Sequence, residues 1–291
     1  MKPPKLSSAT TQEITRMYKM LDYHGLGPVY CDEGGDAFWE DRRGPCKKLG
    51  IALAKALRTR LPPMGRSLYV GAGVPEIPVL LMERLELNRT VCPYNLRQAE
   101  VDILNQAGGE NGIHFYCGSA ETATGKVDHL WIVSVLNDPE EFPNLSVLFS
   151  YGRADPLAFD VSAFSHERET GVRLFANCMA KLTLPGLLTT SVEEMPWVEH
   201  WCHLHGIPYQ VENRTYPTAL VGDPVCFIHI GSEQLLFCLS LLGGKAKDQG
   251  CYETDSPWIN WRRTTRLPLS SPFALRRNGR KIDCHQPKKQ G

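Results

Sequence analysis

The chain has 291 residues, of which 42% are hydrophobic and 22% are charged, as is ordinary for a globular protein. This composition excludes collagen, coiled coil and general disorder as the main architecture. The 32 basic residues balance the 32 acidic residues, so the chain as a whole has no net field to attract a polyanion or a polycation.

The cysteines and the apolar runs indicate in which cellular compartment the protein is found. Ten cysteines are scattered along the chain, without the close pairs that zinc or redox motifs need. We interpret them as thiols in a reducing compartment. The first residues contain no apolar signal segment, and apolar runs such as 235–242 are far shorter than a membrane span. We therefore expect a cytoplasmic protein with no membrane partner.

The first 60 residues are predicted to be mainly helical. Apolar residues at helical spacing, with Thr10 and Glu13 as a capping box, predict an amphipathic helix over 11–21. A glycine-rich aromatic loop is expected over 25–39, followed by a second helix that begins after Pro45.

Strands and helices alternate from residue 66 onward. Apolar runs predict strands at 67–70, 89–92, 113–117, 129–136, 186–191, 209–212 and 225–230. Helical patterns separate the earlier strands, but the last two follow each other closely. This order predicts an α/β protein with a doubly wound parallel sheet that ends in an antiparallel pair.

A glycine pair ends the first of these strands. Gly71-Ala72-Gly73 leads into a helix, and glycines at such a turn let the backbone approach a ligand closely. Glu76 occupies the place of the third glycine in a dinucleotide fingerprint, which disfavours NAD.

The glycine pair and the strand order together resemble the class I S-adenosylmethionine (SAM) dependent methyltransferases over about residues 66–231. The resemblance implies a seven-stranded Rossmann-like sheet with SAM as methyl donor or as substrate. It also implies three parts: a helical cap or lid (1–60), a SAM-binding catalytic domain (61–243) and a basic extension (244–291).

The resemblance implies that the cofactor contacts follow the first four strands. Two departures are evident, because Tyr69 replaces the usual acid before the glycines and Asn95 follows the second strand where an acid usually binds the ribose. Helix capping is an alternative role for Asn95 and Ser119. The candidate cofactor-binding residues are Tyr69, Gly71, Ala72, Gly73, Tyr94, Asn95, Ser119, Ala120, Asn137 and Asp138.

The candidate catalytic residues come from two segments. Asn137 opens Asn-Asp-Pro-Glu, a partial match to the amino-methyltransferase motif, although a simple turn is an alternative. The aromatic and acidic segment 28–40 contributes Tyr30, Asp36 and Glu40, which could contact a cation or act as base, or belong to a plain surface loop. We expect no metal, because the ligands of the segment 200–205 fall on two sides of one helix.

Three functions remain open. The first is a methyltransferase that acts on a small molecule by in-line transfer in a lidded pocket. The second attacks the aminobutyrate arm of SAM and releases methylthioadenosine, since the glycine pair with its prolines also resembles nicotianamine synthase and azetidine-carboxylate-forming SAM cyclases. The third is a non-catalytic methyltransferase-like module. We expect Gly73→Val to block the adenosine site without unfolding the chain.

The zero net charge conceals a division. Residues 244–291 contain 11 basic and 4 acidic residues, which leaves 21 basic and 28 acidic residues in 1–243. We therefore expect a small substrate for the acidic body rather than a nucleic acid. The basic extension, with Trp258 and Trp261 among its arginines, is the segment where a polyanion could bind.

Overall fold

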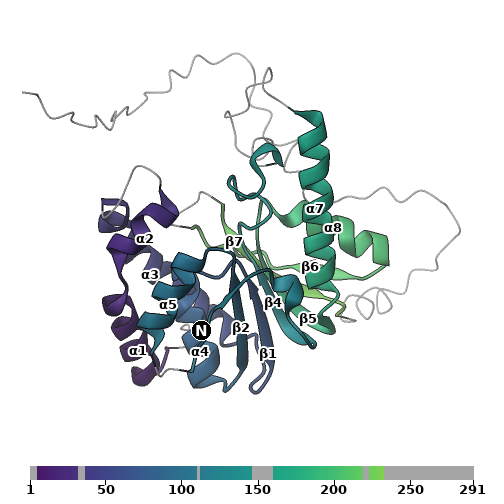
Figure 1. Ribbon diagram of the computed structural model, residues 1–291. Helices are drawn as coiled ribbons and strands as arrows, with labels where there is room; N and C mark the ends of the chain where they lie inside the picture. The colour runs from purple at the N-terminus through teal and green to yellow at the C-terminus, as the bar shows by residue number, and fades with distance from the viewer. Residues whose placement is uncertain (1–4, 32–36, 110–111, 146–159, 219–222, 233–291) are drawn as a thin grey trace, which may run out of the picture. The chain divides into compact units, whose positions relative to one another are not determined.

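The computed structural model describes residues 5–31, 37–109, 112–145, 160–218 and 223–232. The predicted basic extension and Asp36 lie outside these residues. A seven-stranded sheet runs through the described part in the order β3-β2-β1-β4-β5-β7-β6 (Figure 1). Strands β1 to β5 are parallel, and β7 is antiparallel to both β5 and β6. The predicted doubly wound sheet with a terminal antiparallel pair is confirmed, as is the fold that the methyltransferase resemblance implies.

The strands begin and end close to the positions that their apolar runs predict. Their bounds are β1 Arg66–Val70, β2 Thr90–Asn95, β3 Tyr116–Cys117, β4 Val127–Ile132, β5 Leu182–Ser191, β6 Tyr209–Val211 and β7 Val225–Ile230. The helices are α1 Ser8–Met20, α2 Tyr23–Tyr30, α3 Ala37–Leu57, α4 Ile77–Glu86, α5 Gln98–Gly108, α7 Val161–Met179 and α8 Met195–His205. Short 3₁₀ turns follow β1 at Val74–Glu76 and β3 at Ala120–Thr122.

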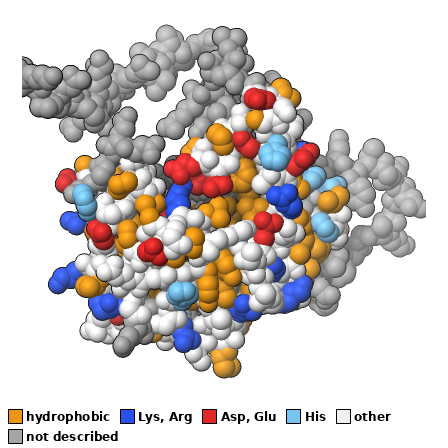
Figure 2. Space-filling view, viewed as in Figure 1, with side chains coloured by type: hydrophobic (Ala, Val, Ile, Leu, Met, Phe, Trp, Pro, Cys, Tyr) orange, Lys and Arg blue, Asp and Glu red, His pale blue; other side chains and the backbone are white. Residues whose placement is uncertain are grey.

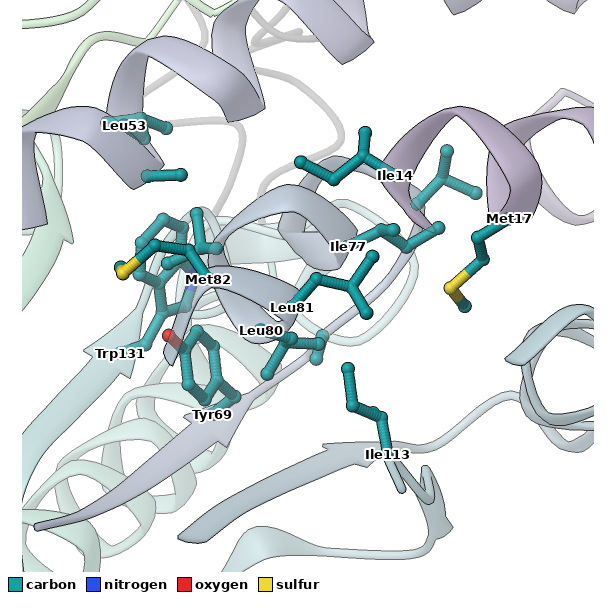
Figure 3. Close-up of a cluster of buried hydrophobic side chains, with 14 of the residues drawn as sticks. Ile14, Met17, Leu53, Tyr69, Ile77, Leu80, Leu81, Met82, Ile113 and Trp131 are labelled. Carbon is teal, nitrogen blue, oxygen red and sulfur yellow. The ribbon is translucent and has the colours of Figure 1, made fainter. Parts of the chain in front are cut away.

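Alternate strand residues serve two separate cores. Tyr69, Trp131 and Phe227 face the core that the N-terminal helices and α4 complete. Figure 3 shows Tyr69, Trp131 and Met82 together in this core. The neighbouring residues Leu68 and Leu130 face the opposite core, which α7 and α8 cover. Both faces of the sheet are therefore covered, and a ligand has to enter along an edge.

Three predictions for the front segment are wrong. The first helix has Ser7 as its N-cap residue, so Thr10 lies inside α1 rather than at its cap. The expected loop over 25–39 contains α2, because Asp22 caps its first turn through the Gly25 N–H and Leu26 is fully buried. The next helix, α3, begins before Pro45 rather than after it. Burial of Trp39 stabilises this early start, since the ring packs against Tyr23 and Tyr30.

Strand β6 ends one residue earlier than predicted, and β3 and β4 are shorter than predicted for local reasons. The side-chain amide of Asn105 bonds both the N–H and the carbonyl of Phe115, at 2.8 and 2.9 Å, so that only Tyr116–Cys117 pairs with β2. Strand β4 ends at Ile132 because Ser134 adopts a φ of +56°, a left-handed conformation that interrupts a strand. The backbone after β4 therefore turns at the end of the sheet.

Candidate functional site

The backbone turns sharply where β1 ends. Gly71 has a φ of +70°, and a side chain there would begin 2.9 Å from a methyl group of Val135. Gly73 has an ordinary extended backbone, but a Cβ would lie 2.5 Å from Glu100 Oε1 and 2.6 Å from the Tyr30 hydroxyl. The geometry argues against the expectation that Gly73→Val spares the fold, because the larger side chain would displace buried polar groups.

A cleft with two compartments follows the carboxyl ends of β1, β2 and β4. The first compartment, of about 110 Å³, is lined by Tyr94, Leu96, Ser119, Ala120 and Val135. The second, of about 270 Å³, lies beneath α2 and α3. Its lining includes Tyr30, Leu49, Leu53, Glu76, Glu100 and Trp131. The two share Gly71, Asn95, Arg97, Val133, Ser134 and Asp138, so they form one continuous cleft.

Most of the predicted cofactor-binding residues lie at this cleft. The structure brings together Gly71, Gly73, Tyr94, Asn95, Ser119, Ala120 and Asp138. Tyr69, Ala72 and Asn137 do not line it. Tyr69 points into the core and donates its hydroxyl hydrogen to Glu83. Asn137 binds Glu193 at 2.8 Å, beyond the lining of either compartment.

Asn95 is already engaged in bonds within the protein. Its amide nitrogen donates to Ala72 O at 2.9 Å and to Glu100 Oε2 at 3.0 Å, and its oxygen accepts from the Arg97 N–H at 2.8 Å. Both amide hydrogens are therefore used in bonds within the protein. Ser119 likewise accepts from the Glu121 N–H at 3.2 Å and caps a 3₁₀ turn. The capping alternative is confirmed for Ser119. For Asn95 it is wrong, because Arg97 is the N-cap residue of α5 and this helix has no side-chain capping bond.

The candidate catalytic residues lie in different places. Tyr30 lines the second compartment, where its hydroxyl donates to Glu100. Glu40 is exposed on the first turn of α3 and does not line the cleft. Asp36 lies outside the described residues. Of the catalytic candidates that the structure describes, Tyr30 is the one that lines the cleft.

Two buried carboxyl groups in the second compartment were missed from the sequence. Burial raises the pKa of Glu76 to about 7, although a bond from the Gly73 N–H opposes the rise. Burial also raises the pKa of Glu100, against hydrogen bonds from Tyr30 and Asn95. The signal for Glu76 was its place directly after the glycine pair. For Glu100 there was none, since an acid in the first turn of a helix is common.

Arg97 lines both compartments of the cleft. Its guanidinium group pairs with Asp138 at 3.2 Å and with Glu140 at 2.7 Å. On the face drawn in Figure 2, red acidic side chains gather near the middle around a blue basic one. The cleft lining includes the acidic residues Asp138, Glu140 and Glu141 beside Arg97, a balance that suits a cationic ligand.

Two hydroxyl groups of the second compartment lack a partner. Ser134 Oγ and Thr218 Oγ1 are buried and form no hydrogen bond within the described structure. A buried polar atom without a partner is costly, so such an atom beside a cavity indicates a place where a ligand can bond.

The histidines of α8 do not converge. Cys202 is fully buried, whereas His200 and His203 are exposed, as the helical spacing predicts. Among the described residues, no three His, Cys, Asp or Glu side chains come together as metal ligands. Within the same ranges, every helix is too short or too polar to cross a lipid bilayer.

No family model and no curated protein matches the chain. It is similar to the solved structure of Trm5b from Pyrococcus abyssi (8% identity, 63% of this chain, 49% of that chain, TM-score 0.40). It is also similar to magnesium protoporphyrin IX methyltransferase from Synechocystis PCC 6803 with bound SAM (12% identity, 78% of this chain, 98% of that chain, TM-score 0.46). A third similar structure is precorrin-6y C5,15-methyltransferase from Geobacter metallireducens GS-15 (10% identity, 62% of this chain, 87% of that chain, TM-score 0.38). The chain spans about half the length of the Trm5b chain.

Proposed function

We propose that the protein is a SAM-dependent methyltransferase that acts on a small, amine-bearing molecule. The observation that carries the proposal is the continuous cleft at the carboxyl ends of β1, β2 and β4. Open α/β sheets bind their ligands at this edge. The cleft combines a compartment with an aromatic wall and a larger compartment that holds two buried carboxyl groups.

The residues present suit SAM. Tyr94, Leu96 and Ala120 offer apolar surface for an adenine ring, and Gly71 lets the ligand approach the backbone. Glu76 and Glu100 suit the positively charged methionine end, and the unpartnered hydroxyls of Ser134 and Thr218 are available to polar ligand atoms. Asp138 borders both compartments and is available to the ribose in place of Asn95.

An amine acceptor fits the second compartment. Tyr30 and Trp131 present aromatic surface to a cation, while Leu49 and Leu53 exclude water. Glu76, with a pKa near neutrality, can take the proton that an ammonium group must lose before its nitrogen reacts. These residues supply orientation, a dry site and a proton acceptor.

The bound cofactor supplies a methyl group already activated by positively charged sulfur. The protein therefore has little covalent work to do. In the proposed reaction Glu76 would first take a proton from the acceptor ammonium group. The neutral nitrogen would then form a bond to the methyl carbon as the carbon–sulfur bond breaks, so that the positive charge moves from sulfur to nitrogen. S-adenosylhomocysteine is the expected nucleoside product.

A second candidate function is attack on the aminobutyrate arm of the same molecule. Two observations favour this second function. The Asn95 amide is used in bonds within the protein, and Tyr69 points into the core. The cleft thus lacks both acids that the methyltransferase resemblance implies. Methylthioadenosine would be the product of this reaction, so mass spectrometry of the nucleoside distinguishes it from methyl transfer.

A matched pair of aromatic variants tests the cofactor site. Tyr94 lines the first compartment, while Tyr116 stacks behind it at 5.2 Å between ring centroids and does not line the cleft. We expect Tyr94→Ala to weaken SAM binding by about 5- to 160-fold in calorimetry, since aromatic stacking of a base contributes ~1–3 kcal/mol. Tyr116→Ala should bind within about twofold of wild type.

The outcome separates the alternatives. Equal affinity in wild type and Tyr94→Ala, with both proteins folded by circular dichroism, would contradict this placement of the cofactor. Absence of SAM binding by wild-type protein would favour the non-catalytic module. Incubation of wild-type protein with SAM and a metabolite extract then identifies the nucleoside product.

A further inference from the structure

A second hollow lies on the outer side of α3, away from the cleft. Its volume is about 750 Å³, and we call it the α3 groove. Five of its lining residues are basic, namely Lys47, Lys48, Lys55, Arg60 and Arg214. None of the described residues that line it is acidic. The groove is therefore a local concentration of positive charge on a body whose sequence has an acidic balance.

Helical spacing separates the groove from the cleft. Cys46, Leu49 and Leu53 of α3 line the second compartment, whereas Lys48, Ile51, Ala52 and Lys55 of the same helix line the groove. At 1.5 Å per residue, Lys48 and Lys55 lie two turns and about 10 Å apart along one face. The small side chains of Ala52 and Ala56, between these lysines and beyond them, leave the surface hollow.

Two of the five cations already have internal partners. Arg60 forms two hydrogen bonds to Glu212, at 2.7 and 2.6 Å, and Lys47 donates to Thr15 Oγ1 at 3.0 Å. Glu212 is also bonded by His229 at 3.0 Å, so its charge is already shared. It remains turned toward these two partners rather than toward the lysines of α3.

The other three cations have no acidic partner within the part of the chain that the structure describes: Lys48, Lys55 and Arg214. The guanidinium carbon of Arg214 lies 4.8 Å from the centroid of the Tyr216 ring, which fixes a planar cation at the wall of the groove. Three unpaired cations around one concavity are complementary to a row of anionic groups.

We propose that the α3 groove binds the phosphodiester backbone of a single-stranded nucleic acid. A groove flanked by cations along a helix follows the shape of a strand, whereas a planar membrane would contact its rims alone. The zero net charge of the whole chain does not oppose this binding, because phosphate contacts depend on charge within a Debye length, about 8–10 Å. The site is independent of the proposed methyl transfer.

The test is a titration of the full-length chain without SAM. Fluorescence anisotropy follows a labelled single-stranded RNA of about 20 nucleotides, at several salt concentrations. The groove variant Lys48→Gln/Lys55→Gln is compared with Arg173→Gln/Lys181→Gln, which removes the same charge from α7 and the turn that follows it. We expect the groove variant to bind about tenfold more weakly and to lose roughly 0.7 from the salt slope for each phosphate contact.

The control variant should bind like wild type, and its Tm should match that of the groove variant. Equal affinity in the groove variant and wild type would overturn the proposal, because binding would then come from elsewhere, including the basic extension. Binding to vesicles that contain phosphatidylserine, without binding to RNA, would overturn it in favour of a membrane. Absence of any RNA binding would overturn it as well, and none of these results bears on SAM turnover.

Discussion

Glu194 is a buried acid that fixes the loop after β4. Its carboxylate accepts the N–H groups of Ser134, Val135 and Leu136, at 3.0, 2.7 and 2.8 Å, and it is fully buried. Ser134 and Val135 line the cleft. Three successive backbone donors on one carboxylate hold this wall in a single conformation, which includes the left-handed Ser134.

We predict that Glu194→Gln loosens this wall. A glutamine amide has one acceptor oxygen where the carboxylate has two. Its NH₂ group is a donor and cannot accept a hydrogen bond from a backbone N–H. The free energy of unfolding should fall by about 1–3 kcal/mol, and SAM should bind several-fold more weakly. Chemical denaturation and calorimetry measure the two effects. Glu169→Gln, at an exposed position of α7, is the control, and equal SAM affinity in the Glu194 variant would show that the loop shape is independent of this carboxylate.

At the scale of single residues, the sequence predicted the glycine turn and much of the cleft lining, but the bonding state of these residues could not be predicted. Asn95 looked free to bind a ribose, yet its amide hydrogens go to Ala72 and Glu100. The Glu100 carboxyl group lies on α5, whereas Asn95 is the last residue of β2. Local patterns show which residue types are available, whereas long-range hydrogen bonds decide which are already used.

At the scale of elements, prediction succeeded where periodicity was strong. The predicted bounds of β7, 225–230, match the structure residue for residue. Five of its six residues are apolar, and the sixth, His229, lies between two isoleucines, as is typical of a buried strand. Prediction failed over 25–45, where glycine and proline indicated a loop. Burial of Leu26 and Trp39 stabilises helices there against local propensity.

A buried polar cluster connects several elements at the other end of the sheet. Glu83 of α4 binds Arg89 at 2.9 Å, and it also accepts hydrogen bonds from Ser67 and Tyr69 of β1. Arg89 in turn pairs with Asp128 of β4. Glu83 and Arg89 are both fully buried, so each charge depends on the other.

We predict that Glu83→Ala destabilises the fold by about 3–5 kcal/mol, because it leaves Arg89 buried without one of its two acidic partners. Urea unfolding measures the change. Arg84→Ala, at the next and exposed position of α4, should cost less than about 1 kcal/mol. Equal effects of the two substitutions would mean that the buried cluster contributes no more to stability than a surface charge.

At the scale of the whole molecule, buried acids divide into two groups with opposite pH behaviour. Burial raises the pKa of Glu76, Glu100 and Glu194. For Glu83, hydrogen bonds and charge from His129 and Arg89 outweigh burial and lower the pKa to about 2. The sequence could not reveal this division, since it depends on which carboxyl groups meet a cation after folding.

The two groups predict opposite dependences of stability on pH. Glu83 is ionised in the folded state well below its unfolded pKa of 4.5, so its contribution is lost as the pH falls from 4.5 toward 2. Glu76 binds a proton more tightly in the folded state, so its stabilisation is lost as the pH rises from 4.5 through about 7. The free energy of unfolding should therefore be larger at pH 5–6 than at pH 8. Below pH 4.5 the loss from Glu83 is opposed by Glu76, Glu100 and Glu194, whose contributions grow as the pH falls.

Glu76→Gln isolates the alkaline side of this profile. A shift in pKa from 4.5 to about 7 corresponds to about 2.5 kcal/mol between pH 5 and pH 8. Glutamine keeps an oxygen that accepts the Gly73 N–H, but it cannot ionise. The free energy of unfolding of the variant should therefore fall much less between pH 5 and pH 8 than that of wild type. Glu100 and Glu194 should account for the fall that remains. Glu40→Gln, at an exposed position, should keep the wild-type profile. A decline of the same size in Glu76→Gln and wild type would show that Glu76 titrates alike in the folded and unfolded chains, and would remove it as the proton acceptor of the proposed reaction.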